Sequence, residues 1–118
     1  MSFEDAIDVL TEKLKKNNFG VLTTINVKEK FKKKLGIEFK KYVILGTYNP
    51  ASAYKAIEVE ENIGLMLPCN VIVYEKGDHV VISAIKPTVA MQMIDNPKLS
   101  NIATEVEKQI KQVIETVC

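Results

Sequence analysis

Two central segments of the sequence, 42–48 and 65–74, are apolar on both faces of the strands that they predict. Both are rich in β-branched and aromatic residues, which favour strands. Side chains alternate between the two faces of a strand, so apolar residues at odd and even positions need cover on both sides. Either helices or a second subunit can provide that cover, and we favour a homodimer.

Helical and strand patterns follow one another along the whole chain. Apolar spacing and capping signals predict helices over 2–16, 28–35 and 50–61, a helical turn or two over 88–95, and a final helix after Asn96-Pro97. Strand patterns cover 20–27, 42–48, 65–74 and 79–85, the last two joined in a hairpin. The order α-β-α-β-α-β-β-α predicts the α+β class, with one mixed or antiparallel four-stranded sheet packed with helices. The length of 118 residues predicts a single domain, 1–118.

The same spacing predicts which side chains enter the core. The first and last helices carry apolar stripes of Phe3, Ile7, Leu10 and Leu14, and of Leu99, Ile102, Val106, Ile110, Val113 and Val117. In the strand over 20–27, alternation places Val21, Ile25 and Val27 on one face. In the strand over 65–74, it places five apolar residues on one face: Leu65, Leu67, Cys69, Val71 and Val73. In the helix over 28–35, Phe31 and Leu35 are spaced to point inward.

Composition narrows the possible functions. The chain has 16 Lys and no Arg, and its net charge is only +1, so it lacks both the guanidinium fork and a global field for binding polyanions. No apolar stretch approaches the roughly 20 residues of a membrane-spanning helix. Glu4, Asp5 and Asp8 do not fit a signal peptide, and we therefore expect a cytoplasmic protein.

Cys69 is the first candidate for chemistry. A thiolate is a nucleophile when cations or a helix N-terminus lower its pKa, so one alternative function is a thiol-dependent enzyme or redox sensor. His79, the only histidine, could pair with Cys69 for nucleophilic catalysis, but we favour the interpretation that His79 is a solvated turn residue. The expected face of Cys69 is strongly apolar, which favours a structural role. We expect Cys118 to be exposed, and we expect no metal or cofactor, since one His and two distant Cys fall short of a zinc site.

A basic segment lies at 28–41. Its seven lysines exceed Glu29 and Glu38 by five, which leaves a net charge of −4 for the rest of the chain. With Phe31 and Phe39 among the lysines, Lys28–Lys41 could bind nucleic acid weakly, which is a second alternative function. We favour a solvated helix face, and we expect no membrane partner.

The strand over 42–48 leads through Asn49-Pro50 into a helix, where free N–H groups can cap the helix or hold an anion. This helix start and the Leu67-Pro68-Cys69-Asn70 strand are the most distinctive parts of the sequence. Our leading hypothesis is a homodimeric domain that binds a small ligand there. The candidate ligand residues are Tyr48, Asn49, Cys69 and Asn70, and no catalytic motif is recognised.

These motifs carry a family resemblance over residues 3–117. The residues concerned are Gly20-Val21-Leu22, Tyr42-Val43-Ile44-Leu45-Gly46 before Asn49-Pro50, and Ile63-Gly64 before Leu67-Pro68-Cys69-Asn70-Val71. The chain resembles the uncharacterised family called domain of unknown function 302. The resemblance implies a TATA-box-binding-protein-like α+β fold, usually homodimeric, and no established activity. Members often have Cys before the Asn-Pro where this chain has Tyr48, which argues against a role that needs two thiols.

Overall fold

The structure is a computed structural model that describes residues 1–117. The expectation that Cys118 is exposed concerns a residue outside this range. In chain order the elements are α1 (Phe3–Lys16), β1 (Gly20–Asn26), α2 (Val27–Leu35), β2 (Tyr42–Tyr48), α3 (Pro50–Val59), the 3₁₀ helix η1 (Glu61–Met66), β3 (Cys69–Lys76), β4 (His79–Ala84), α4 (Pro87–Ala90), the 3₁₀ helix η2 (Met91–Met93) and α5 (Lys98–Val117). The predicted α+β class and element order are confirmed. Among the helices of residues 1–117, none is long and apolar enough to cross a membrane.

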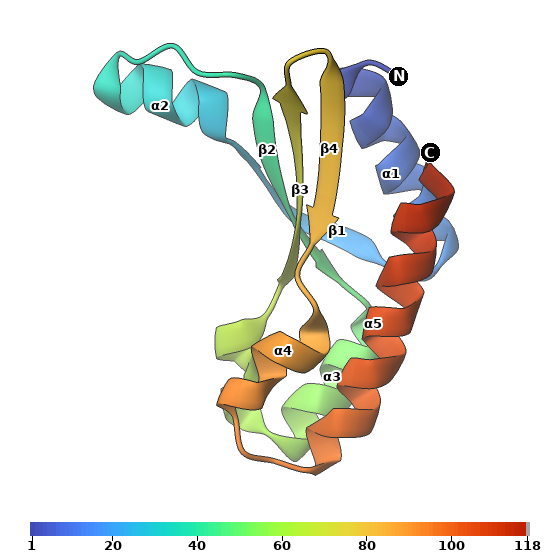
Figure 1. Ribbon diagram of the computed structural model, residues 1–118. Helices are drawn as coiled ribbons and strands as arrows, with labels where there is room; N and C mark the ends of the chain where they lie inside the picture. The colour runs from blue at the N-terminus through green and yellow to red at the C-terminus, as the bar shows by residue number, and fades with distance from the viewer. Residues whose placement is uncertain (118) are drawn as a thin grey trace.

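The four strands form one sheet in the order β1-β2-β3-β4, and every neighbouring pair is antiparallel. Helices α1 and α5 lie side by side on one face of this sheet, and α3 and α4 lie beyond its lower end (Figure 1). The main core fills the space between the sheet and these two long helices, and a second apolar cluster joins α3, η1, η2 and α5. The sheet therefore has one face covered by its own helices, and α2 projects on the side of the other face.

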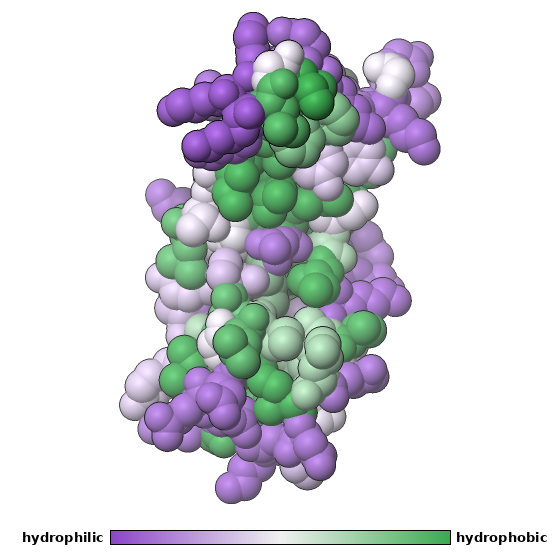
Figure 2. Space-filling view, turned by 90° about the vertical axis from the view of Figure 1, so that its left-hand side faces the viewer, coloured by the Kyte–Doolittle hydropathy of each residue, from purple (hydrophilic) through white to green (hydrophobic). Residues whose placement is uncertain are grey.

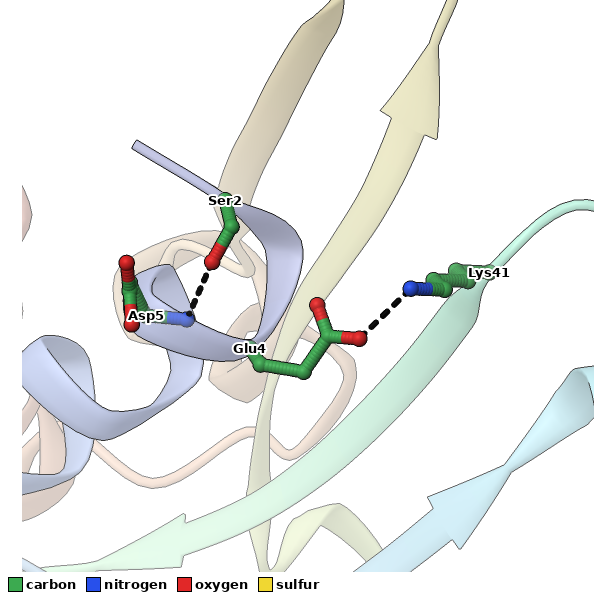
Figure 3. A network of polar contacts seen from close by, with 4 residues as sticks. All are labelled: Ser2, Glu4, Asp5 and Lys41. Atoms are coloured by element: carbon green, nitrogen blue, oxygen red, sulfur yellow. Dashed lines mark hydrogen bonds and ion pairs between the residues drawn. The ribbon is translucent and has the colours of Figure 1, made fainter.

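Helix α1 begins and packs as its sequence predicts. The Ser2 hydroxyl accepts a hydrogen bond from the Asp5 backbone N–H at 3.0 Å, which satisfies one free donor of the first turn. Glu4 binds the Lys41 ammonium at 2.5 Å and so ties the start of α1 to the residue before β2 (Figure 3). The stripe points into the core, where Leu10 and Leu14 are fully buried.

Helix α5 also follows its predicted stripe. Five of the six predicted positions are buried, and Ile102 packs against both apolar clusters as a partly buried residue. Asn96 accepts a hydrogen bond from the Lys98 N–H at 3.0 Å, which fits the Asn-Pro start. Because α5 is long enough to contact both clusters, it connects the sheet to the α3–α4 end of the molecule.

The prediction for β1 was wrong about one face. A β-bulge between Val21 and Thr23 shifts the register, so Val21 packs against the core while Ile25 pairs with Ile44 on the opposite face and is 42% exposed. Val27 is not in the strand, because the Asn26 side chain accepts a hydrogen bond from the Glu29 N–H and starts α2 there.

The third strand is shorter than its predicted range of 65–74. Residues 61–66 form η1, and the Glu60 carboxylate accepts a hydrogen bond from the Asn62 N–H at its start. Leu65 is 80% exposed and does not share the buried face of Cys69, Val71 and Val73. Pro68, which follows a cis peptide bond, has no N–H to donate to a strand partner, so pairing begins at Cys69.

Helix α2 does not bury the side chains that were predicted to point inward. None of its nine residues is buried, and Leu35 is 64% exposed. Phe31 instead packs edge-to-face on Phe39, with ring centroids 5.2 Å apart. Helical periodicity marks the apolar side of a helix, but only the tertiary structure supplies a surface for it. Gly36 ends α2 at φ +66°, a left-handed backbone conformation that favours glycine.

Candidate functional site

A narrow cleft lies where the two apolar clusters meet. Its walls are the ends of β2 and β3, the first half of α3, Met91 and the middle of α5; the lining residues are Phe19, Thr47, Tyr48, Asn49, Ser52, Ala53, Ala56, Leu67, Cys69, Met91, Ile102 and Val106. We call it the inner cleft. It encloses about 350 Å³ including its mouth, but its interior admits only about one water molecule.

The inner cleft brings together three of the four candidate residues. Tyr48, Asn49 and Cys69 all line it. Asn70 does not, because the next residue along β3 faces the other side of the sheet, and its side chain is exposed there. The lining from Met91, Ile102 and Val106 was not predicted. The only sequence signal for these three residues is apolar character, which does not distinguish a cleft wall from an ordinary core.

Asn49 is the main polar group of the cleft wall and is only 9% exposed. Its Oδ1 accepts a hydrogen bond from the Ser52 N–H at 3.2 Å, and its Nδ2 donates to Gln109 Oε1 at 3.3 Å. The first bond caps α3, and the second links α3 to α5. Since Asn49 already occupies a free N–H of the first turn, the capping interpretation accounts for this helix start and weakens the anion-site interpretation.

Cys69 is buried and 8% exposed. Its carbonyl oxygen accepts a hydrogen bond from the Thr47 hydroxyl at 2.8 Å, which fixes the edge of the cleft between β2 and β3. Burial raises the pKa of the Cys69 thiol above its ordinary value of 9.0. The group is therefore a neutral thiol at pH 7, which argues against a nucleophile.

The state of Cys69 gives a direct prediction. In a Cys118→Ser background, we expect dithionitrobenzoate at pH 7 to modify Cys69 more than about tenfold more slowly than it modifies the unfolded chain. Well below pH 9 both states keep the proton, and as pH rises through 9.0 the unfolded thiol ionises first. The free energy of unfolding then falls with pH. The further change Cys69→Ala, compared in parallel denaturation curves, should remove this part of the decline, and rapid modification at pH 7 would contradict the prediction.

The suggested pairing of Cys69 with His79 was wrong. Cys69 is the first residue of β3, whereas His79 pairs with Lys76 at the far end of the same strand. Seven residues of strand separate them by roughly 20 Å. The His79 side chain is 81% exposed and lies 3.3 Å from Asp78 in the turn. Within residues 1–117, no three His, Cys, Asp or Glu side chains come together as a metal-binding group.

A second hollow, which we call the outer groove, adjoins the inner cleft. It is lined by Leu22, Tyr48, Pro50, Ala53, Tyr54, Ile57, Gly64, Leu67 and Pro68, and it encloses about 720 Å³ including its open side. Tyr48, Ala53 and Leu67 line both hollows and form the partition between them. The outer groove is almost wholly apolar, so it is suited to apolar groups rather than to anions.

Two close approaches shape the outer groove. A Cβ atom at Gly46 would lie 2.7 Å from Cγ of Pro68, so only glycine in β2 lets the Pro68 ring sit on this side of the sheet. A Cβ atom at Gly20 would lie 3.1 Å from Cε1 of Tyr48, so the Tyr48 ring lies close over β1. The shape of the outer groove therefore depends on two glycines, Gly20 and Gly46, that were not predicted to be site residues.

The lysines of the basic segment have different surroundings. Lys41 binds Glu4, which raises the pKa of Lys41 and lowers the pKa of Glu4 through the hydrogen bond between them. Lys32 lies 3.3 Å from Glu38. Lys40 lies 4.7 Å above the Tyr74 ring centroid. Part of the +5 charge is therefore engaged within the chain, and the rest projects on α2.

The fold and the cleft define a small α+β domain in which two long helices cover one face of an antiparallel sheet. The family model "Domain of unknown function DUF302" matches residues 1–117. The chain therefore belongs to the DUF302 family, which confirms the resemblance found in the sequence.

A solved structure gives the same assignment. The crystal structure of the uncharacterized conserved protein DUF302 from Bacillus stearothermophilus matches with a TM-score of 0.91 and 33% sequence identity. The match covers 98% of this chain and 90% of that one. No curated protein matches the chain. The comparisons identify the fold and family, and the function must be argued from the site.

Proposed function

We propose that the chain is a homodimeric binding domain that takes a small, mainly apolar ligand across the outer groove and the mouth of the inner cleft. The observation that carries the proposal is the shared partition of Tyr48, Ala53 and Leu67 between two apolar hollows. Ligand sites are concave, mainly apolar and supplied with few polar groups. Here Tyr48, which belongs to the partition, and Asn49, which follows it in the chain, supply polar side chains.

The size of each hollow decides how a ligand would be held. The inner cleft is too narrow for more than about one water, so the body of a ligand belongs in the outer groove against Pro68 and Tyr54. A small terminal group would enter the cleft mouth beside Ala53. This arrangement suits a compact aromatic or branched aliphatic molecule with one hydrogen-bonding group.

The thiol-dependent alternative is less well supported. Burial raises the pKa of the Cys69 thiol, and the only histidine lies at the far end of the same strand, so this environment does not favour a thiolate. The modification experiment on Cys69 separates this alternative from the binding function.

Blocking the partition tests ligand binding. We expect 1-anilinonaphthalene, a neutral aromatic probe, to bind the wild type and to shift the amide resonances of Tyr48, Asn49 and Leu67. The substitution Ala53→Phe fills both hollows and should weaken this binding by about tenfold or more, a loss of about 1.4 kcal/mol. Fluorescence titration and amide chemical shifts measure the two effects.

The matched control is Ala51→Phe. Ala51 is on the same helix, is exposed and does not line either hollow, so its replacement should leave probe binding unchanged. Equal binding by the two variants would show that the probe binds elsewhere and would overturn the proposal. Absence of any resonance shift at Tyr48, Asn49 and Leu67 in the wild type would overturn it as well.

A further inference from the structure

One face of the sheet is apolar and has no helix of residues 1–117 packed across it. Helices α1 and α5 lie on the opposite face (Figure 1). The register places Ile25, Ile44 and Ile72 side by side on this open face, and Tyr42 stacks on Tyr74 next to them with ring centroids 5.3 Å apart. All five side chains are half-buried or exposed. An apolar area of this kind on a sheet is typical of an interaction surface.

Helix α2 is poorly supported by its own chain. It projects from the upper end of the sheet on the open side, and Phe31, Leu35 and Ile37 are 37%, 64% and 50% exposed. A helix of nine residues is marginal in water unless its apolar side is packed. The radius of gyration is 15.2 Å, against roughly 13–14 Å for a compact chain of this length. Apart from the contact between Phe31 and Phe39, the apolar side of α2 is therefore largely uncovered within residues 1–117.

Charge is distributed unequally between the two ends of the open side. Figure 2 shows hydrophobic residues over much of the middle of this side, around one hydrophilic group at its centre, with hydrophilic residues at its upper and lower ends. The upper end carries the lysines of α2, and the lower end carries Glu58, Glu60 and Glu61 where α3 passes into η1. Glu58 and Glu61 are exposed, and no ion pair within residues 1–117 uses either of them.

We infer that a second copy of this chain covers the open face in an antiparallel, two-fold arrangement. In it, α2 of each protomer lies against the α3–η1 end of the other. Two-fold packing of like faces has two orientations. With the long axes parallel, the lysines of one α2 would face those of the other, and like charges repel. With the long axes antiparallel, lysines face Glu58 and Glu61 at both ends, and the apolar middles meet.

This inference depends on the proposed homodimer and adds its interface. It also gives α2 the apolar surface that it lacks, because the exposed Ile57 and Leu65 lie at the α3–η1 end of the partner. Leu65 lines neither hollow, whereas Ile57 is also part of the wall of the outer groove. The outer groove opens near the same end, so the ligand would lie close to the α2 of the second protomer.

Reciprocal charge reversal tests the orientation. The double variant Lys30→Glu/Lys33→Glu should weaken the dimer by about tenfold or more at low salt, because it opposes like charges at both ends. The double variant Glu58→Lys/Glu61→Lys should do the same. The four substitutions together should restore the dissociation constant to within a few-fold of the wild type. Sedimentation equilibrium measures each dissociation constant, and circular dichroism checks the fold.

Lys108→Glu/Lys111→Glu on α5 is the matched control, since it makes the same change in net charge on the helix-covered side. It should leave the dissociation constant unchanged. In addition, Ile72→Glu in the middle of the open face should yield monomers. Each of these results supports the inference.

The contrary results separate the inference from the proposed function. A wild type that is monomeric at micromolar concentration overturns both the homodimer and this interface, whereas ligand binding is judged separately by Ala53→Phe. A dimer that is unaffected by Lys30→Glu/Lys33→Glu, or not rescued by the four substitutions, overturns the antiparallel orientation alone. Lys30→Glu/Lys33→Glu could instead leave the dimer intact and abolish salt-sensitive binding of a single-stranded RNA oligonucleotide. That result would mean that α2 binds nucleic acid, and the inference would be wrong.

Discussion

Replacing Leu10 by alanine is expected to lower the free energy of unfolding by about 2–5 kcal/mol. Leu10 on α1 is completely buried in the main core, so its truncation leaves a cavity that the close-packed neighbours cannot fully close. Urea denaturation at one fixed protomer concentration measures the loss, because the stability of a dimer depends on concentration.

Ile7→Ala provides the comparison. Ile7 is on the same apolar stripe of the same helix but is only partly buried at the edge of the core. Its truncation should have a clearly smaller effect than that of Leu10. Similar losses for the two variants would mean that α1 does not pack on the sheet as described.

Replacing Gly46 by alanine is expected to lower the free energy of unfolding by about 1–3 kcal/mol and to disturb the site. The new Cβ would clash with the Thr23 hydroxyl oxygen and would lie 2.7 Å from Cγ of Pro68. The threonine can change rotamer, but the proline ring is fixed to the backbone, so the Leu67-Pro68 segment must move. Amide resonances of Leu67 and Cys69 should shift, and binding of the anilinonaphthalene probe should weaken.

Gly64→Ala is the control for the effect of Gly46→Ala on stability; it is not a control for probe binding, because Gly64 itself lines the outer groove. A Cβ at Gly64 meets no atom within 4 Å, and the residue has no positive φ. We expect its stability to be unchanged or slightly raised, since alanine restricts the unfolded chain. If Gly46→Ala were as well tolerated as Gly64→Ala, the close contact between β2 and Pro68 would be wrong.

Much of the fold could be predicted because the signals are local. The stripe from Phe3 to Leu14 repeats with the helical period, and Ser2 and Asn49 supply side-chain caps wherever the chain leads afterwards. The predictions that were wrong, for Leu65 and Ile25, have a different cause. The residues around Leu65 have the apolar pattern of a strand. However, the Glu60 cap starts the 3₁₀ helix η1 there, and Pro68 has no N–H to donate, so strand pairing begins only at Cys69. The side chain of Ile25 lies on the face opposite to the predicted one, because the extra residue of the β-bulge reverses the alternation of side chains.

The candidate site shows the same division. Tyr48, Asn49 and Cys69 were found from two sequence motifs, and they line one cleft because β2 and β3 are neighbours in the sheet. Asn70 belongs to the same motif but faces the opposite side. The partition residues Ala53 and Leu67 carry no chemical signal, so only their position between two hollows identifies them.

The sequence by itself determined the element order, the caps, the apolar stripes and the presence of strands that are apolar on both faces. Only the tertiary structure decided that α1 and α5 lie on the same face, so that within residues 1–117 no helix packs across the other face and α2 has no buried residue. The physical reason is that periodicity specifies which side of an element avoids water. It does not specify which other element, or which other chain, will cover that side.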